Sequence, residues 1–165
     1  MNKTILVPID YSDVTDAILD QAARLAMALD ARLHVVHAAM IHPMVYAPYH
    51  AGMGTASPRK SKDQMMREAG EHLTMIAEKC GRDVPHVTTV LLEGHIGPAI
   101  MDEAMRIKPM MIVMGSHGHG ALHHLLAGSV CEYMMKHAVC PIMIVPSRTG
   151  AYDADAKTEH AVTSG

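Results

Sequence analysis

The chain has 165 residues, of which 49% are hydrophobic and 19% are charged. This length suits one domain with a sizeable core, and the composition is that of a globular protein and not of a disordered chain. The formal net charge of −3 gives no reason to expect a nucleic acid or an anionic membrane as a partner, and no apolar stretch reaches the roughly 18 residues of a membrane span.

The first predicted elements are a strand, a helix and a second strand. Thr4–Ile9 is a short apolar run followed by Asp10, which is typical of a buried strand. Ser12 is a candidate cap for a helix, because apolar residues recur at helical spacing after it. These residues are Ile18, Ala22, Leu25 and Leu29. Arg32–Ala39 is the second predicted strand.

A long loop and a second helix follow. The segment Met40–Lys60 contains three prolines and two glycines, so a loop is predicted, and loops of this length are usually functional or mobile. Ser61 and Gln64 have the spacing of a capping box, and Gly81 suits the end of the helix that they begin. The apolar stripe of this helix consists of Met65, Ala69, Leu73, Ile76 and Cys80.

Three strands and two helices are predicted in the remainder of the chain. The strands are Val87–Leu92, Met110–Met114 and Pro141–Val145, and the last helix is Val130–His137. The helix before the fourth strand starts at Gly97-Pro98, with Pro98 at its first position and an inner face of Ile100, Ala104 and Ile107. Residues 147–165 are polar and lack periodicity, so we expect one domain over residues 1–146 and a disordered tail over 147–165.

The alternation of strands and helices predicts the fold class. Five strands that alternate with four helices favour an open, mostly parallel α/β sheet with helices on both faces. In such sheets, ligands bind beyond the carboxyl ends of the strands, at a topological switch point. Asp10 and Gly115 each lie just past a predicted strand, so they are candidate ligand-binding residues.

The most informative segment is the glycine-rich run Gly115–Ser129, GSHGHGALHHLLAGS. It follows a predicted strand and precedes a predicted helix, and this arrangement offers a phosphate group both close backbone approach and unpaired helix N–H groups. The run is neither a Walker A loop nor a dinucleotide-binding fingerprint. Glycines that serve only the geometry of the turn are the alternative interpretation.

Several motifs together resemble the universal stress protein family, over roughly residues 3 to 146. They are ILVPIDYS at the first strand, GHIGPAIMDEA before the third helix, IVMGSHG at the fourth strand, and GSVCEYMMKHAVCPIMIVP near the end. Gly115, Gly118 and Gly128, followed by Ser129, match the G-x2-G-x9-G-Ser/Thr pattern of the family's ATP-binding branch. The resemblance implies a flavodoxin- or Rossmann-like domain that binds ATP, with ADP and AMP as the other candidates, and Mg or Mn through the phosphates.

The resemblance also implies a set of ligand-binding residues and a dimer. By this resemblance, Pro8, Ile9 and Asp10 should border the adenosine, and Val36 should lie near the adenine. Met114 and Gly115 should line the ribose and phosphate region. By the same resemblance, the phosphates should be held by Gly118, His119, Gly128, Ser129 and Val130. In this family the fifth strand, here Pro141–Val145, commonly pairs across a homodimer.

The chain departs from the family pattern in its glycine loop. Basic residues are common there in the family, whereas Gly115–Val130 contains no Lys or Arg and places histidines instead. The Asp that often precedes the core of the fourth strand is replaced by Met110, which we interpret as a structural difference. If loop histidines contact the phosphates, ATP affinity should rise as the pH falls from about 8 to 6, because a phosphate favours the charged imidazole.

The candidate side chains also have ordinary structural interpretations. Asp10 could bind ribose hydroxyls or a metal on the phosphates, or it could cap the first helix or be an acid at a strand end. Its position at the predicted crevice favours the ligand role. Ser129 can cap a helix and bind phosphate at once. The loop histidines 117, 119, 123 and 124 could bind Zn, Ni or Cu, but solvated histidines are the default. His34 and His37 should point to opposite faces of a strand and not form a pair.

Two classes of function remain open, together with a metal-responsive variant. A nucleotide-binding regulator of the stress response, recognised by an unknown protein partner, is favoured over an enzyme. A slow ATPase is the alternative, but catalysis needs charge stabilisation at the γ-phosphate, and the chain offers only His119 and Asp10 there. The odd number of cysteines (Cys80, Cys131 and Cys140) and the absence of a secretory signal at the N-terminus predict reduced thiols and a cytoplasmic location.

Overall fold

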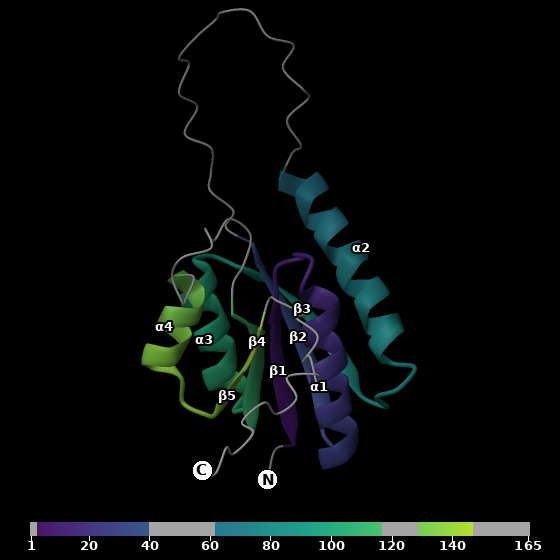
Figure 1. The fold of residues 1–165 in the computed structure, drawn as a ribbon. Coiled ribbons are helices and arrows are strands. Elements are labelled where there is room, and N and C mark those ends of the chain that lie inside the picture. Colours follow the sequence, from purple (N-terminus) through teal and green to yellow (C-terminus); the bar gives the residue numbers. More distant parts are fainter. Residues whose placement is uncertain (1–2, 40–61, 117–128, 147–165) are drawn as a thin grey trace, which may run out of the picture.

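The computed structural model describes residues 3–39, 62–116 and 129–146, and within these ranges strands and helices alternate (Figure 1). The elements are β1 (Thr4–Ile9), α1 (Thr15–Leu29), β2 (Arg32–Ala39), α2 (Lys62–Cys80), β3 (Val87–Glu93), α3 (Ile96–Ile107), β4 (Met111–Gly115), α4 (Ser129–His137) and β5 (Ile142–Val145). The predicted loop at 40–60, the Ser61 cap and the tail lie outside the described residues.

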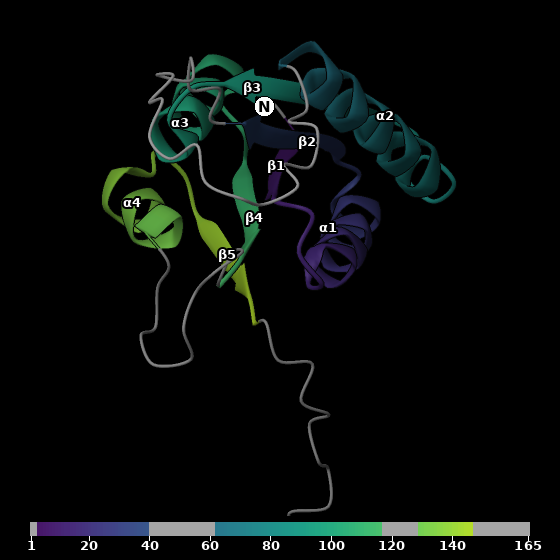
Figure 2. The same ribbon diagram turned by 90° about the horizontal axis from the view of Figure 1, so that it is seen from above.

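The strands form one parallel sheet in the order β3-β2-β1-β4-β5. The helices α1 and α2 cover one face, and α3 and α4 cover the other (Figure 2). This arrangement follows from the connections, because the chain moves outward from β1 through β2 to β3 and then returns to place β4 on the other side of β1. The predicted α/β class, with a five-stranded parallel sheet between two helical layers, is confirmed.

Alternate residues of the strands build two apolar layers, because successive side chains of a strand point to opposite faces. Ile5, Val7 and Val35 pack with the α1 side, and α1 adds its face of Ile18, Leu19 and Ala22. Leu6, Val36 and Ile112 pack with α3 and α4 through Ile100, Ala104 and Met134. The central strand β1 is therefore apolar over both faces, as its uninterrupted sequence TILVPI predicts.

Two predicted helix starts are wrong. Ser12 does not cap α1, because its own carbonyl accepts the N–H of Thr15 at 3.0 Å and the helix begins three residues later, after Val14, without a side-chain cap. Pro98 is the third and not the first residue of α3, because the turn already closes between the N–H of Ala99 and the carbonyl of His95 at 2.9 Å. Both errors shift a boundary and leave the helix in place.

Candidate functional site

The carboxyl ends of β1 and β4 meet at one edge of the sheet, which is the upper edge in Figure 1. From β1 the chain continues through α1 to β2 on one side, and from β4 it continues through α4 to β5 on the other. Neighbouring strands whose connections diverge in this way form a topological switch point, where α/β sheets commonly bind ligands. Asp10 follows β1 and Gly115 ends β4, so the structure brings these two predicted residues to this edge.

The apolar residues predicted for the site are packed into the sheet. Pro8 pairs directly with Val36 across β1 and β2. Val36 is fully buried and lies in the same apolar layer as Met114, whereas Ile9 lies in the opposite layer. Ala38 continues the face of Val36 toward the carboxyl edge and is 7% exposed. These side chains therefore pack on both faces of the sheet, next to its carboxyl edge.

Residues from the glycine-rich run are only partly described. Gly118, His119 and Gly128 lie outside the described residues, and so do His117, His123 and His124. Ser129 is the first residue of α4 and Val130 is the second. Gly115 pairs with Val145, and the N–H of Ser116 donates to the carbonyl of Val145 at 3.0 Å, so the start of the run is anchored on β5.

The turn after β1 holds the carboxylate of Asp10 in place. Its Oδ1 accepts the N–H of Ser12 at 3.1 Å. Tyr11, between them, has a φ of 59°, in the left-handed region that residues other than glycine seldom adopt. Within the described ranges, the buried hydroxyls of Ser12 and Thr15 have no hydrogen-bond partner. Unpaired buried hydroxyls that follow Asp10 closely in the chain fit a polar ligand.

Tyr11 and His37 are features of this edge that the sequence did not indicate. The Nδ1 atom of His37 lies 2.9 Å from the carbonyl of Ile9, at the end of β1. The ring of Tyr11 packs on the His37 ring, with 4.3 Å between the ring centroids. The hydroxyl of Tyr11 donates to the carbonyl of Ala69 on α2 at 3.1 Å. Burial raises the pKa of Tyr11 to about 12, so the hydroxyl keeps its proton at ordinary pH.

A buried polar network joins β2, β3 and α3 on the other face. The Nε2 atom of His34 lies 2.6 Å from Oε1 of Glu103, and its Nδ1 atom lies 2.7 Å from the hydroxyl of Thr88. Both His34 and Glu103 are 7% exposed. Arg106 donates from Nε to Oε2 of Glu103 at 2.7 Å, and this guanidinium, followed by His34, holds the pKa of Glu103 below its usual range.

These contacts confirm that His34 and His37 point to opposite faces of β2, with His34 toward α3 and His37 toward α2. The described residues contain no group of three or more His, Cys, Asp or Glu side chains that could hold a metal ion. In the same ranges, no helix is long and apolar enough to cross a membrane.

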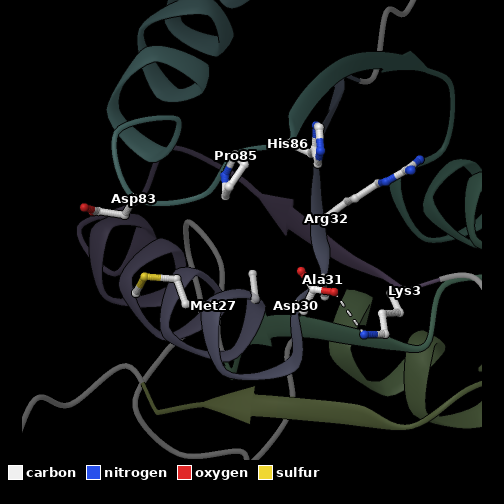
Figure 3. A pocket seen from close by; sticks show the side chains of 9 residues that line it. Lys3, Met27, Asp30, Ala31, Arg32, Asp83, Pro85 and His86 are labelled. Atoms are coloured by element: carbon white, nitrogen blue, oxygen red, sulfur yellow. Dashed lines mark hydrogen bonds and ion pairs between the residues drawn. The ribbon is translucent and has the colours of Figure 1, made fainter.

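A cavity of about 660 Å³ lies at the opposite, amino edge of the strands (Figure 3). It is lined by Lys3, Ala26, Met27, Asp30, Ala31, Arg32, Asp83, Pro85 and His86. Lys3 is paired with Asp30 at 3.2 Å, whereas Arg32 and Asp83 point away from that pair. Charges of both signs that do not converge give this cavity no clear ligand class, and it lies away from the carboxyl edge.

Comparison with known proteins identifies relatives over most of the chain. A model of the universal stress protein family matches residues 1–146. A universal stress protein of Thermus aquaticus is 32% identical over 145 residues, covering 88% of this chain and 99% of the relative. One from Methanocaldococcus jannaschii is 28% identical over 144 residues, covering 87% and 81%.

Solved structures share the fold. The universal stress protein of Archaeoglobus fulgidus in complex with dAMP superposes with a TM-score of 0.62 at 21% identity, covering 87% of this chain and 98% of that one. A universal stress protein in complex with cAMP superposes with a TM-score of 0.61 at 18% identity, covering 87% and 96%.

Proposed function

The chain belongs to the universal stress protein family. We therefore propose that it binds an adenine nucleotide, with ATP as the first candidate, at the carboxyl ends of β1 and β4. The observation that carries the proposal is the meeting of Asp10 and Gly115 at the topological switch point of the sheet. Relatives of the same fold that were solved with dAMP and cAMP support adenine nucleotides as the ligand class.

The proposed site combines rigid support with polar groups. Pro8, Ile9, Val36 and Met114 support the base and sugar from the sheet, and Asp10 accepts hydrogen bonds from the ribose or binds a metal on the phosphates. Gly115, Gly118, His119, Gly128, Ser129 and Val130 hold the phosphates near the N-terminus of α4, where unpaired N–H groups favour anions. The carboxylate of Asp10 and the hydroxyls of Ser12 and Thr15 are hard oxygen ligands of the kind that suits Mg or Mn.

The proposed activity is regulatory, with little or no turnover of ATP. A bound nucleotide stabilises the conformation that it prefers, and a protein partner in the cytoplasm distinguishes that conformation from the empty one. Turnover would need a group that stabilises charge at the γ-phosphate, and Gly115–Val130 carries no lysine or arginine.

The proposed assembly is a homodimer through β5. This strand lies at the edge of the sheet and pairs with β4 on one side only, among the described strands. Its residues Ile142, Met143 and Ile144 are only partly buried, and an apolar strand edge is a ready template for pairing with a second copy.

Sedimentation equilibrium tests the dimer. The measured mass should be twice the mass of the chain, and a monomer at micromolar concentration would contradict the dimer.

Replacing Asp10 with alanine is expected to weaken ATP binding about 10- to 100-fold, because hydrogen bonds to a charged group are worth about 1.5–3 kcal/mol. Isothermal titration calorimetry with Mg-ATP measures the change. The matched control is Asp102→Ala, which removes an exposed carboxylate from the middle of α3 and should leave the affinity unchanged. Equal affinity of the Asp10 variant and the wild type would place the nucleotide elsewhere.

A further inference from the structure

Tyr11 is built into the turn that carries Asp10. Its left-handed backbone, with φ at 59°, turns the chain between Asp10 and Ser12, and the N–H of Ser12 is the donor to the Asp10 carboxylate. A residue other than glycine keeps such a conformation only when its surroundings hold it there. Tyr11 and the N–H donor to the Asp10 carboxylate therefore belong to one turn.

The side chain of Tyr11 crosses from this turn to α2. Its ring packs against His37 of β2 and meets the ring of His72 edge-on, with 5.2 Å between the centroids. Its hydroxyl donates to the carbonyl of Ala69, 58 residues away in the sequence. One side chain thus joins the ends of β1 and β2 to the middle of α2.

The carbonyl of Ala69, which accepts the Tyr11 hydroxyl, lies next to Gly70, where the helix is locally less stable. Gly70 is an interior residue of α2, and a Cβ added to it would meet no atom within 4 Å, so packing does not require a glycine there. Interior glycine lowers helix stability, and the hydroxyl of Thr74 bonds to the Gly70 carbonyl at 2.9 Å, a type of bond that often bends helices.

The two parts of α2 differ in burial. Leu73 and Cys80 are buried in the core, whereas none of residues 63–72 is buried. Figure 1 shows the N-terminal part of α2 extending beyond the carboxyl ends of the strands, on the side of the proposed site. The core therefore holds the part after Leu73, and Tyr11 holds the helix just before Gly70.

We infer that Tyr11 couples the nucleotide site to the N-terminal part of α2, residues 63–70, so that nucleotide binding and the position of this helical segment regulate each other. The inference rests on the proposed function, because the coupled site is the one that contains Asp10. Coupling of this kind is reciprocal: a nucleotide that fixes the Asp10 turn also fixes residues 63–70, and a partner that displaces them weakens nucleotide binding.

Hydrogen exchange of the full chain, followed by mass spectrometry with and without Mg-ATP, tests the coupling. In the wild type, Mg-ATP should slow the exchange of residues 63–70 and leave residues 74–80 unchanged. Tyr11→Phe removes only the hydroxyl, so residues 63–70 should exchange about fivefold faster without ATP, the ratio expected for one hydrogen bond, and should lose their response to ATP. The matched control is Tyr133→Phe on α4, which should behave as the wild type.

A second variant tests the effect of Gly70 on the local stability of α2, independently of Tyr11. Gly70→Ala should slow the exchange of residues 63–70 about fivefold without ATP, because alanine is the better helix former and its Cβ has open space.

Two results would overturn the coupling alone. In the first, calorimetry shows that ATP binds, but the exchange of residues 63–70 does not change. In the second, ATP protects these residues equally in the wild type and in Tyr11→Phe. Absence of ATP binding would overturn the proposed function and the coupling with it, whatever Tyr11→Phe does to α2.

Discussion

Replacing Glu103 with alanine should lower the free energy of unfolding by about 3 kcal/mol. Glu103 and His34 are both 7% exposed, so the substitution leaves the imidazole of His34 buried without its carboxylate partner. Leaving a buried polar group unpaired costs about 1–3 kcal/mol, and breaking a buried ion pair costs about 3–5 kcal/mol. The expected value lies where these two ranges meet.

Urea unfolding of matched variants measures this effect. Glu103→Gln keeps the shape of the side chain and one hydrogen bond, and it should cost less than Glu103→Ala. Glu132→Ala removes an exposed carboxylate that pairs with Lys136 at 2.7 Å on α4, and it should change stability by less than about 0.5 kcal/mol. A cost for Glu103→Ala as small as that for Glu132→Ala would show that the buried network does not stabilise the fold.

The same network gives a pH dependence with a definite sign. The pKa of Glu103 is lowered in the folded protein, first by the N–H donors of Arg106 and then by His34. Its stabilising contribution is therefore fully present above the unfolded-state pKa, near 4.3, and is lost as the pH falls through the lower folded-state value. The stability difference between the wild type and Glu103→Gln should thus shrink in acid below about pH 4.

Replacing Gly97 with alanine should destabilise the protein by about 1–3 kcal/mol, although alanine is the better helix former. A Cβ at Gly97 would lie 2.7 Å and 2.9 Å from two ring carbons of Tyr133, including the carbon at the root of the ring. The whole ring of Tyr133 would therefore have to move where α3 packs on α4.

Gly70, which lies inside α2, supplies the control for this prediction. Gly70→Ala places its Cβ in open space and should be neutral or stabilising. Adding Tyr133→Ala to Gly97→Ala should remove the clash, so the two substitutions should cost less together than their separate costs predict. Additive costs by urea unfolding would show that the ring does not limit the residue at position 97.

The fold could be predicted from the sequence because its signals are local. The five strands and four helices follow from apolar runs and helical spacing, and their alternation implies the parallel sheet. The errors fell at helix ends, where Ser12 and Pro98 have the residue types of a helix start but the backbone bonds close elsewhere. A backbone turn that depends on a left-handed Tyr11 has no signature in the sequence, since that conformation is typical of glycine.

The candidate site could be predicted only where its residues lie at strand ends. The position of Asp10 and Gly115 at one edge follows from the sequence in this way, because the carboxyl ends of parallel strands meet at one edge. The contacts that connect the sheet to the helices join residues far apart in the chain, namely Tyr11 with Ala69 and His34 with Glu103, at separations of 58 and 69 residues. Such pairs depend on how the helices pack on the sheet, which periodicity does not give.

Equilibrium dialysis of the wild-type protein against labelled ATP with Mg is the most direct test of nucleotide binding. The expected result is saturable binding of one ATP per chain, with the nucleotide recovered as ATP after prolonged incubation. No saturable binding at millimolar ATP would contradict the proposed nucleotide site. Complete conversion of the label to ADP during the dialysis would contradict a regulator with little or no turnover.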